Sequence, residues 1–310
     1  MGLFLEKDVR MRELTPDFSG LWIPLVTPFE RGAVDHPALY RLVRHLANQG
    51  VAGFVVCGST GEAAALSPRE QLAVLDTVRS AAGDLHLVMG LSGYHLPETL
   101  EWVRTLNSRG LHGILVPAPH YIRPSQTGLI QWFEAIANVS TSPVVIYDIP
   151  ARTGSTLALE TLRTLPQHPR IVAIKDCGAD DIKTQYLIAD GALQVLAGDD
   201  SRIFNTVALG GAGAIAAGGH LHTQRMVQVI ALLRAGELQT ARALWRPLLP
   251  LLNALFAEPN PGPLKALMAH QGLLLNELRA PMDAASEGLT ARLQEISDGI
   301  PALVAQTQAA

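Results

Sequence analysis

The sequence alternates short apolar runs with longer amphipathic stretches along most of its length. Strands of a parallel sheet that is covered on both faces read as continuous apolar runs. Stretches of helical character lie between the runs, and several of them begin with a proline, which a first helical turn tolerates. The strand runs are residues 21–27, 53–57, 86–89, 113–116, 144–147, 171–175, 195–197 and 214–217, and the helical stretches include residues 37–49, 68–81, 97–109 and 126–139.

The spacing of the runs predicts a closed barrel. Successive runs begin about 20–33 residues apart, which is room for one strand and one helix. Paired glycines recur where a helix ends and the next strand begins, at residues 50 and 53, 110 and 113, and 210 and 213. The rival, a doubly wound open sheet, usually carries a glycine-rich loop after its first strand, whereas residues 26–29 here are Val-Thr-Pro-Phe. We therefore predict an α/β protein with a (β/α)₈ TIM barrel.

Beyond residue 236 the pattern is helical only. An apolar stretch over residues 244–256 and a break rich in proline and glycine over 258–263 precede helical stretches over 264–275 and 289–306. Apolar helix faces must pack on the barrel or on another subunit. We expect three parts: an N-terminal extension over residues 1–16, a catalytic barrel over 17–236 and a C-terminal helical subdomain over 237–310.

Composition excludes several classes of protein. The chain has 24 Lys and Arg against 28 Asp and Glu, a net charge of −4, and no basic block that would attract nucleic acid or anionic lipid. The sequence has no run of about 18 apolar residues that could span a membrane. Its N-terminus does not have the pattern of a signal peptide. Two cysteines form neither a disulfide framework nor a four-cysteine zinc site. We expect a cytoplasmic protein that binds neither nucleic acid nor membrane.

Two strand ends carry candidate catalytic residues, because reactive side chains of a barrel lie at the C-terminal ends of its strands. Lys175 ends an apolar run, and a lysine desolvated there has a lowered pKa and attacks a carbonyl to form a Schiff base. The alternative is a lysine that extends to water or pairs with Asp176. Tyr147 ends another run, where its phenol can transfer protons. The alternative is a core tyrosine with a satisfied hydroxyl.

Two further loops are candidates for binding an anion. Ser59 and Thr60 stand between glycines after the second strand, so hydroxyl and backbone N–H groups can hold a carboxylate. The alternative is a plain turn in which one hydroxyl caps a helix. Arg152 follows the fifth strand, and a fixed guanidinium there binds a carboxylate with two hydrogen bonds. The alternative is a surface arginine.

Two other motifs point to no additional site. Gly218 and Gly219 follow the eighth strand, where barrels often bind phosphate, but no lysine or clean helix start accompanies them, so we favour close packing. His220 and His222 lack a third ligand within any motif. We expect no metal ion.

Together these loops identify a family. The chain resembles the dihydrodipicolinate synthase / N-acetylneuraminate lyase family of class I, pyruvate-dependent aldolases, from about Phe18 to Met282. The family's motifs occur in its order: Gly58-Ser59-Thr60-Gly61-Glu62, Tyr121-x-Arg123-Pro124-Ser125-Gln126, Tyr147-Asp148-Ile149-Pro150-Ala151-Arg152-Thr153-Gly154, Ile174-Lys175-Asp176 and Gly198-Asp199-Asp200.

The resemblance implies a role for each of these positions. Lys175 would form the imine with pyruvate, and Tyr147 would act as acid and base. A proton relay would join Thr60, Tyr147 and Tyr121, the last from a neighbouring subunit. It also implies a homotetramer, a dimer of tight dimers, and no cofactor, because the protonated imine is itself the electron sink. Ser59 and Thr60 would hold the pyruvate carboxylate, and Ile215 and Gly198 would line the pocket.

The second substrate is implied by two arginines. Arg152, with Arg123 near the mouth, resembles the synthase branch, in which the arginine matching Arg152 binds the carboxylate of L-aspartate 4-semialdehyde. A small anionic aldehyde needs a cation, whereas a sugar needs many hydrogen-bonding groups. Ser59, Asp148 and His120 depart from the synthase pattern. They support the alternative of a pyruvate aldolase or dehydratase acting on a sugar acid or another aldehyde. A non-catalytic keto-acid-binding protein is a third reading.

Four positions bear on regulation. Pro68, Gln71, Tyr94 and His120 stand where lysine-inhibited synthases have His, His, Asn and Tyr. We therefore expect weak or absent inhibition by lysine.

Overall fold

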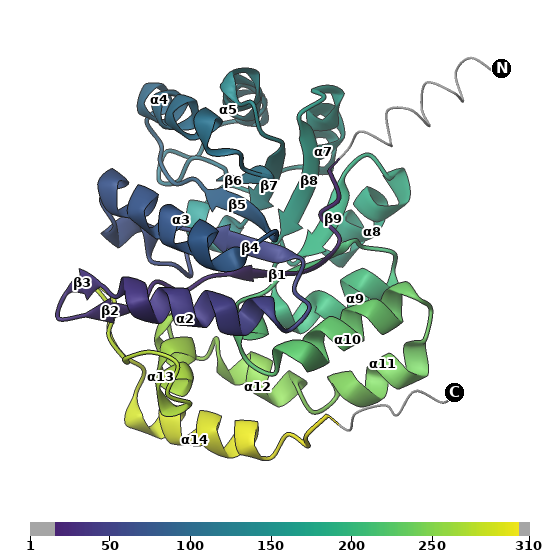
Figure 1. Cartoon of the computed structure of the whole chain (residues 1–310). Helices are drawn as coiled ribbons and strands as arrows, with labels where there is room; N and C mark the ends of the chain where they lie inside the picture. The colour runs from purple at the N-terminus through teal and green to yellow at the C-terminus, as the bar shows by residue number, and fades with distance from the viewer. Residues whose placement is uncertain (1–15, 304–310) are drawn as a thin grey trace.

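The computed structural model describes residues 16–303, and its centre is a closed barrel of eight parallel strands (Figure 1). The strands are hydrogen-bonded in the order β1-β10-β9-β8-β7-β6-β5-β4, so each barrel strand pairs with the next one along the chain. This confirms the predicted barrel and all eight predicted strands. They are β1 (Gly20–Pro24), β4 (Gly53–Val56), β5 (His86–Gly90), β6 (Gly113–Pro117), β7 (Val144–Asp148), β8 (Ile171–Asp176), β9 (Gln194–Ala197) and β10 (Gly213–Ile215).

The barrel interior is packed with side chains from alternate strand positions, as the pleat of a strand requires. Trp22 and Phe18 fill its N-terminal end, where the Trp22 indole donates a hydrogen bond to the Phe18 carbonyl at 2.8 Å. Gly53 is needed beside them, because a Cβ there would lie 2.5 Å from the Trp22 ring. Further residues of this inner cluster are Val55, Val88, Leu115, Val145, Tyr147, Ala173, Leu196 and Ile215.

Helices surround the barrel (Figure 1), and side-chain caps fix where several of them begin. Ser67 accepts from the Glu70 amide while the Glu70 carboxylate accepts from the Ser67 amide, a capping box. The four predicted helices are confirmed, except that the third ends in a 3₁₀ turn over Asn107–Arg109. The outer helices are α2 (His36–Ala47), α3 (Pro68–Ala82), α4 (Leu96–Leu106), α5 (Gln126–Val139), α7 (Leu159–Thr164), α8 (Asp181–Asp190), α9 (Ile203–Ala208) and α10 (Thr223–Arg234).

Short elements outside the barrel escaped the sequence analysis. A hairpin of β2 (Phe29–Glu30) and β3 (Ala33–Val34) follows β1, and a four-residue helix, α6 (Pro150–Thr153), follows β7. Elements this short have no hydrophobic period to read.

The C-terminal part is helical, as expected, with different boundaries. It contains α11 (Leu238–Trp245), α12 (Leu249–Ala254), α13 (Gly262–His270) and α14 (Glu287–Asp298). The expected apolar stretch over residues 244–256 is divided because Pro247 cannot continue a helix. The expected helix over 289–306 is wrong beyond Asp298, because Pro301 disfavours helical geometry at the residue before it and residues 299–303 are not helical.

The division at residue 236 stays a prediction; the expected extension over 1–16 and the end of the subdomain lie almost entirely outside the described residues. Within residues 16–303, no helix is both long and apolar enough to cross a membrane.

Candidate active site

The two candidate catalytic residues meet at the C-terminal end of the barrel. Lys175 and Tyr147 are direct partners in the register of β8 and β7. Their side chains are 5% and 8% exposed. The Lys175 Nζ atom lies 4.4 Å from the centre of the Tyr147 ring. The structure therefore places an amine and a phenol side by side, almost out of contact with water.

The charge state of this pair depends on its neighbours. Burial raises the pKa of Tyr147, against opposing effects of the Lys175 charge and of a hydrogen bond with the Ser59 side chain. Burial raises the pKa of Cys177 to about 12. For Lys175, burial acts to lower the pKa, but the interactions with Tyr147, Cys177 and Asp200 outweigh burial and raise the pKa.

Asp200 is a buried acid whose charge acts to raise the pKa of Lys175. Tyr147 and Cys177 are neutral near pH 7 because burial raises their pKa values. Burial raises the pKa of Asp200 to about 7. Its carboxylate accepts hydrogen bonds from the amides of Ala217 and Gly218, the first at 3.2 Å. Protonation of Asp200 removes one of the contributions that raise the pKa of Lys175.

A cavity of about 570 Å³ opens over Lys175. Gly198 lines it and leaves room for the lysine, because a Cβ there would lie 2.7 Å from the Lys175 Cγ. Ile215 is buried in the inner barrel cluster, and its expected place in the pocket lining stays a prediction. Arg152 is exposed and borders the cavity. The other lining residues named in the sequence analysis are Ser59, Thr60, Tyr147, Asp199 and Asp200.

Ser59 and Thr60 have different partners. The Ser59 side chain lies close enough to Tyr147 to act to lower the pKa of the phenol. The Thr60 hydroxyl accepts from the Asn260 side-chain amide, Nδ2 to Oγ1, at 3.0 Å. These contacts join Tyr147 to Ser59, whereas the relay through Thr60 stays a prediction. Gly61 allows the loop to pass close to β1, since a Cβ there would lie 2.8 Å from the Leu25 carbonyl oxygen.

Arg123 lies near Arg152 without lining the cavity. Its Nε atom occupies the space beside Gly154, where a Cβ would come within 2.6 Å. Gly154 ends the short helix α6 that carries Arg152. Arg123 is exposed and packs on the loop that presents Arg152.

Tyr121 does not reach the cavity of its own chain. It is 87% exposed and adopts φ +75, a strained conformation for a residue with a side chain. A second cavity, of about 370 Å³, shares Ser59 and Tyr147 with the first, and His120 and Met282 also border it.

Sequence reasoning missed the C-terminal wall of the site. Leu252, Asn253, Phe256 and Asn260 line the cavity over Lys175, although they lie about 80 residues further along the chain. The one available signal was a polar Asn260 inside the Pro/Gly-rich break. Cys177, two residues after Lys175, also lines the cavity.

Packing explains Asp148, which departs from the synthase pattern, and His220, which was considered as a metal ligand. Asp148 accepts a hydrogen bond from Lys183 Nζ at 2.6 Å, and both side chains are buried. Asp148 lines neither cavity, so it gives no support to a sugar-acid substrate. Burial lowers the pKa of His220 to about 4, and its ring joins the Val26 amide to the Ala217 carbonyl.

The second histidine considered as a metal ligand is His222. His222 contacts the Ser297 hydroxyl at 3.1 Å. Among residues 16–303, no group of three or more His, Cys, Asp or Glu side chains is arranged to hold a metal ion.

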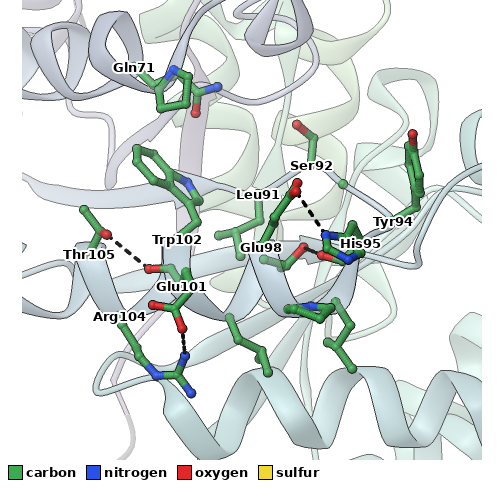
Figure 2. Close-up of a pocket in the computed structure, with 16 residues that line it drawn as sticks. Gln71, Leu91, Ser92, Tyr94, His95, Glu98, Glu101, Trp102, Arg104 and Thr105 are labelled. Carbon is green, nitrogen blue, oxygen red and sulfur yellow. Dashed lines mark hydrogen bonds and ion pairs between the residues drawn. The ribbon is translucent and has the colours of Figure 1, made fainter.

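A separate groove is lined by three of the four positions that bear on lysine, Pro68, Gln71 and Tyr94, whereas His120 borders the second cavity. Figure 2 shows this groove of about 1240 Å³, with Gln71 on one side and Tyr94, His95 and Glu98 on the other. His120 packs edge-on against Tyr94, with ring centres 5.6 Å apart. The Gln71 amide already donates to the Ala63 and Leu66 carbonyls, each at 3.2 Å.

We expect L-lysine to leave the initial rate unchanged at concentrations up to about 1 mM. A dissociation constant of that size or larger is typical of a very weak ligand. Pro68 offers no side-chain hydrogen bond, and the Gln71 amide is already engaged within its own chain. Initial rates measured over a series of lysine concentrations test this. A low-micromolar inhibition constant would contradict it.

The fold and the buried lysine beside a tyrosine define a class: barrel enzymes built for Schiff-base chemistry on a keto compound. The chain matches the model of the dihydrodipicolinate synthetase family over residues 17–298 and belongs to that family. It is 35% identical over 274 residues to the 4-hydroxy-tetrahydrodipicolinate synthase of Leptospira biflexa, covering 87% of this chain and 93% of that protein.

Solved structures of dihydrodipicolinate synthases support the same family assignment. A chloride-inhibited dihydrodipicolinate synthase from Acinetobacter baumannii, complexed with pyruvate, superposes with a TM-score of 0.88 at 31% identity, over 91% of this chain and 99% of that one. The lysine-bound enzyme of Cyanidioschyzon merolae gives a TM-score of 0.87 at 28% identity, over 90% and 97% of the two chains. The resemblance inferred from the motifs is thereby confirmed.

Proposed function

We propose that the protein is a class I lyase that condenses pyruvate with L-aspartate 4-semialdehyde to give 4-hydroxy-tetrahydrodipicolinate, a step of lysine and diaminopimelate biosynthesis. The observation that carries this proposal is the buried Lys175 beside Tyr147, in a cavity bordered by Arg152. The names of the relatives and the pyruvate bound to the Acinetobacter enzyme support it.

The geometry suits the first half of the reaction. The neutral amine of Lys175 attacks the keto carbon of pyruvate, and Tyr147 gives a proton to the oxygen that leaves as water. The resulting iminium draws electrons from the neighbouring methyl group, which loses a proton to form an enamine. Ser59 and Thr60 hold the carboxylate. No additional cofactor takes part, because the iminium itself accepts the electron pair.

In the second half, the enamine carbon attacks the aldehyde carbon, and the new alkoxide takes a proton from the tyrosine relay. The amine of the semialdehyde then adds to the iminium carbon, which closes the ring and releases Lys175. Arg152 holds the semialdehyde carboxylate during these steps, with Arg123 supporting its loop.

The assembly we propose is a homotetramer, a dimer of dimers, in the cytoplasm. Tyr121 is exposed in its own chain, and the second cavity beside Ser59 and Tyr147 offers a partner's phenol a place next to the relay. An apolar patch on a different part of the surface supports a second interface. It consists of Ile182, Tyr186 and Leu209, which are 69%, 51% and 50% exposed.

We expect Arg152→Ala to lower kcat/KM for L-aspartate 4-semialdehyde by about 10²–10³-fold, because the semialdehyde carboxylate loses its charged partner. Pyruvate consumption coupled to a pyridine-nucleotide-dependent reductase measures this. Borohydride trapping of pyruvate should stay unchanged. Arg41→Ala, an exposed arginine on α2, is the matched control.

The outcomes separate the three readings. Turnover that collapses in Arg152→Ala supports the synthase. Pyruvate trapping without turnover of the semialdehyde by the wild type points to a sugar acid or another aldehyde as the second substrate. A well-folded protein that forms no trapped adduct with pyruvate is a non-catalytic binder.

A further inference from the structure

Asn260 contacts the active site from a distant part of the chain. It precedes α13, and its side-chain Nδ2 donates to the Oγ1 of Thr60 at 3.0 Å. Thr60 is 3% exposed and lines the cavity over Lys175. The Thr60 hydroxyl is therefore one of several polar groups that border that cavity, and Asn260 is its hydrogen-bond donor.

A threonine hydroxyl has one proton to donate and accepts through its lone pairs. The Nδ2 group of Asn260 donates only, so in this contact the Thr60 oxygen is the acceptor. Its own proton is then directed to a different acceptor. A carboxylate bound in the cavity is such an acceptor, and hydrogen bonds to a charged oxygen are about twice as strong as neutral ones.

We infer that Asn260 is a positioning residue that makes the Thr60 hydroxyl a hydrogen-bond donor to the carboxylate of the keto acid bound at Lys175. This inference rests on the proposed function. It adds a residue of the C-terminal helical part to the recognition of the first substrate.

The position of Asn260 is set by a buried ion pair close to it. Lys265, on α13, contacts the Glu62 carboxylate at 2.5 Å, and their side chains are 0% and 1% exposed. Glu62 follows Thr60 by two residues and also accepts from the Arg279 amide at 3.1 Å. Two contacts thus join the segment of Asn260 and Lys265 to the loop of Thr60 and Glu62, and they fix the donor against its acceptor.

Two variants of Asn260 should weaken pyruvate binding to different extents. Asn260→Ala removes the donor and leaves the Thr60 hydroxyl free to turn. Asn260→Asp has nearly the same shape, but its carboxylate only accepts, so it takes the Thr60 proton and adds a negative charge beside the substrate carboxylate. We expect the pyruvate concentration for half-maximal trapping to rise about tenfold in Asn260→Ala and about 100-fold in Asn260→Asp.

The experiment traps the imine with borohydride at increasing pyruvate concentration and quantifies the adduct on Lys175 by mass spectrometry, with no aldehyde present. Asn205→Asp, an exposed asparagine on α9, is the control for the added charge. Circular dichroism and a thermal melt establish that each variant is folded. Thr60→Val, alone and with Asn260→Ala, tests whether the effect passes through Thr60.

The expected result is that Asn260→Ala has no further effect in the Thr60→Val background. Unchanged pyruvate dependence in Asn260→Asp, or an undiminished effect of Asn260→Ala in Thr60→Val, would overturn the inference alone. Failure of the wild type to form any adduct would overturn the Schiff-base chemistry of the proposed function, and the inference with it.

Discussion

Replacing Lys175 with alanine is expected to abolish the borohydride-trapped pyruvate adduct and to lower turnover by about 10⁴-fold or more. The amine is the group that bonds to the keto carbon, so no other side chain replaces it. Three lysines lie within residues 16–303, and the other two are tied to carboxylates: Lys183 to Asp148 and Lys265 to Glu62. Lys175 is therefore the lysine whose amine is available in the cavity.

The same argument fixes where the adduct forms in the wild type. Peptide mapping after trapping should place the pyruvate mass on the peptide of Lys175 and leave those of Lys183 and Lys265 unmodified. The Lys175→Ala protein should still show the circular dichroism of the wild type. Unchanged trapping in that variant, or an adduct on another lysine, would contradict the mechanism.

The barrel was predictable because each of its parts leaves a local signal. A strand buried on both faces is a continuous apolar run, and a glycine marks several of the turns from a helix into the next strand. Once the strands are placed, their C-terminal ends give Lys175 and Tyr147 without further information. Their register contact follows from the order of strands in the barrel.

Contacts between distant segments left no such signal. The Asn260 contact with Thr60 spans 200 residues, and the Lys265 contact with Glu62 spans 203. The partner of Asp148 is Lys183 on α8, the helix after the next barrel strand, and this contact turns an apparent departure from the family pattern into a buried ion pair. Adjacent hydroxyls in one loop also point to different partners, so sequence alone did not separate Ser59 from Thr60.

The ion pair of Lys265 and Glu62 gives the second large effect. We expect Lys265→Met to lower the free energy of unfolding by about 3–5 kcal/mol, because it leaves the Glu62 carboxylate buried without a counter-charge. Burial lowers the pKa of Lys265, and Glu62 opposes that shift. The ammonium also lies 4.4 Å from the centre of the Phe29 ring and donates to the Glu277 carbonyl at 2.8 Å.

Urea denaturation of Lys265→Met and of the double variant Glu62→Gln with Lys265→Met measures this cost. The double variant has no buried charge to compensate, so it should recover a large part of the lost stability. Activity should fall in both, because Glu62 holds the loop of Ser59 and Thr60 against the C-terminal helices. If the free energy of unfolding of Lys265→Met lies within about 0.5 kcal/mol of the wild-type value, this ion pair does not fix the loop.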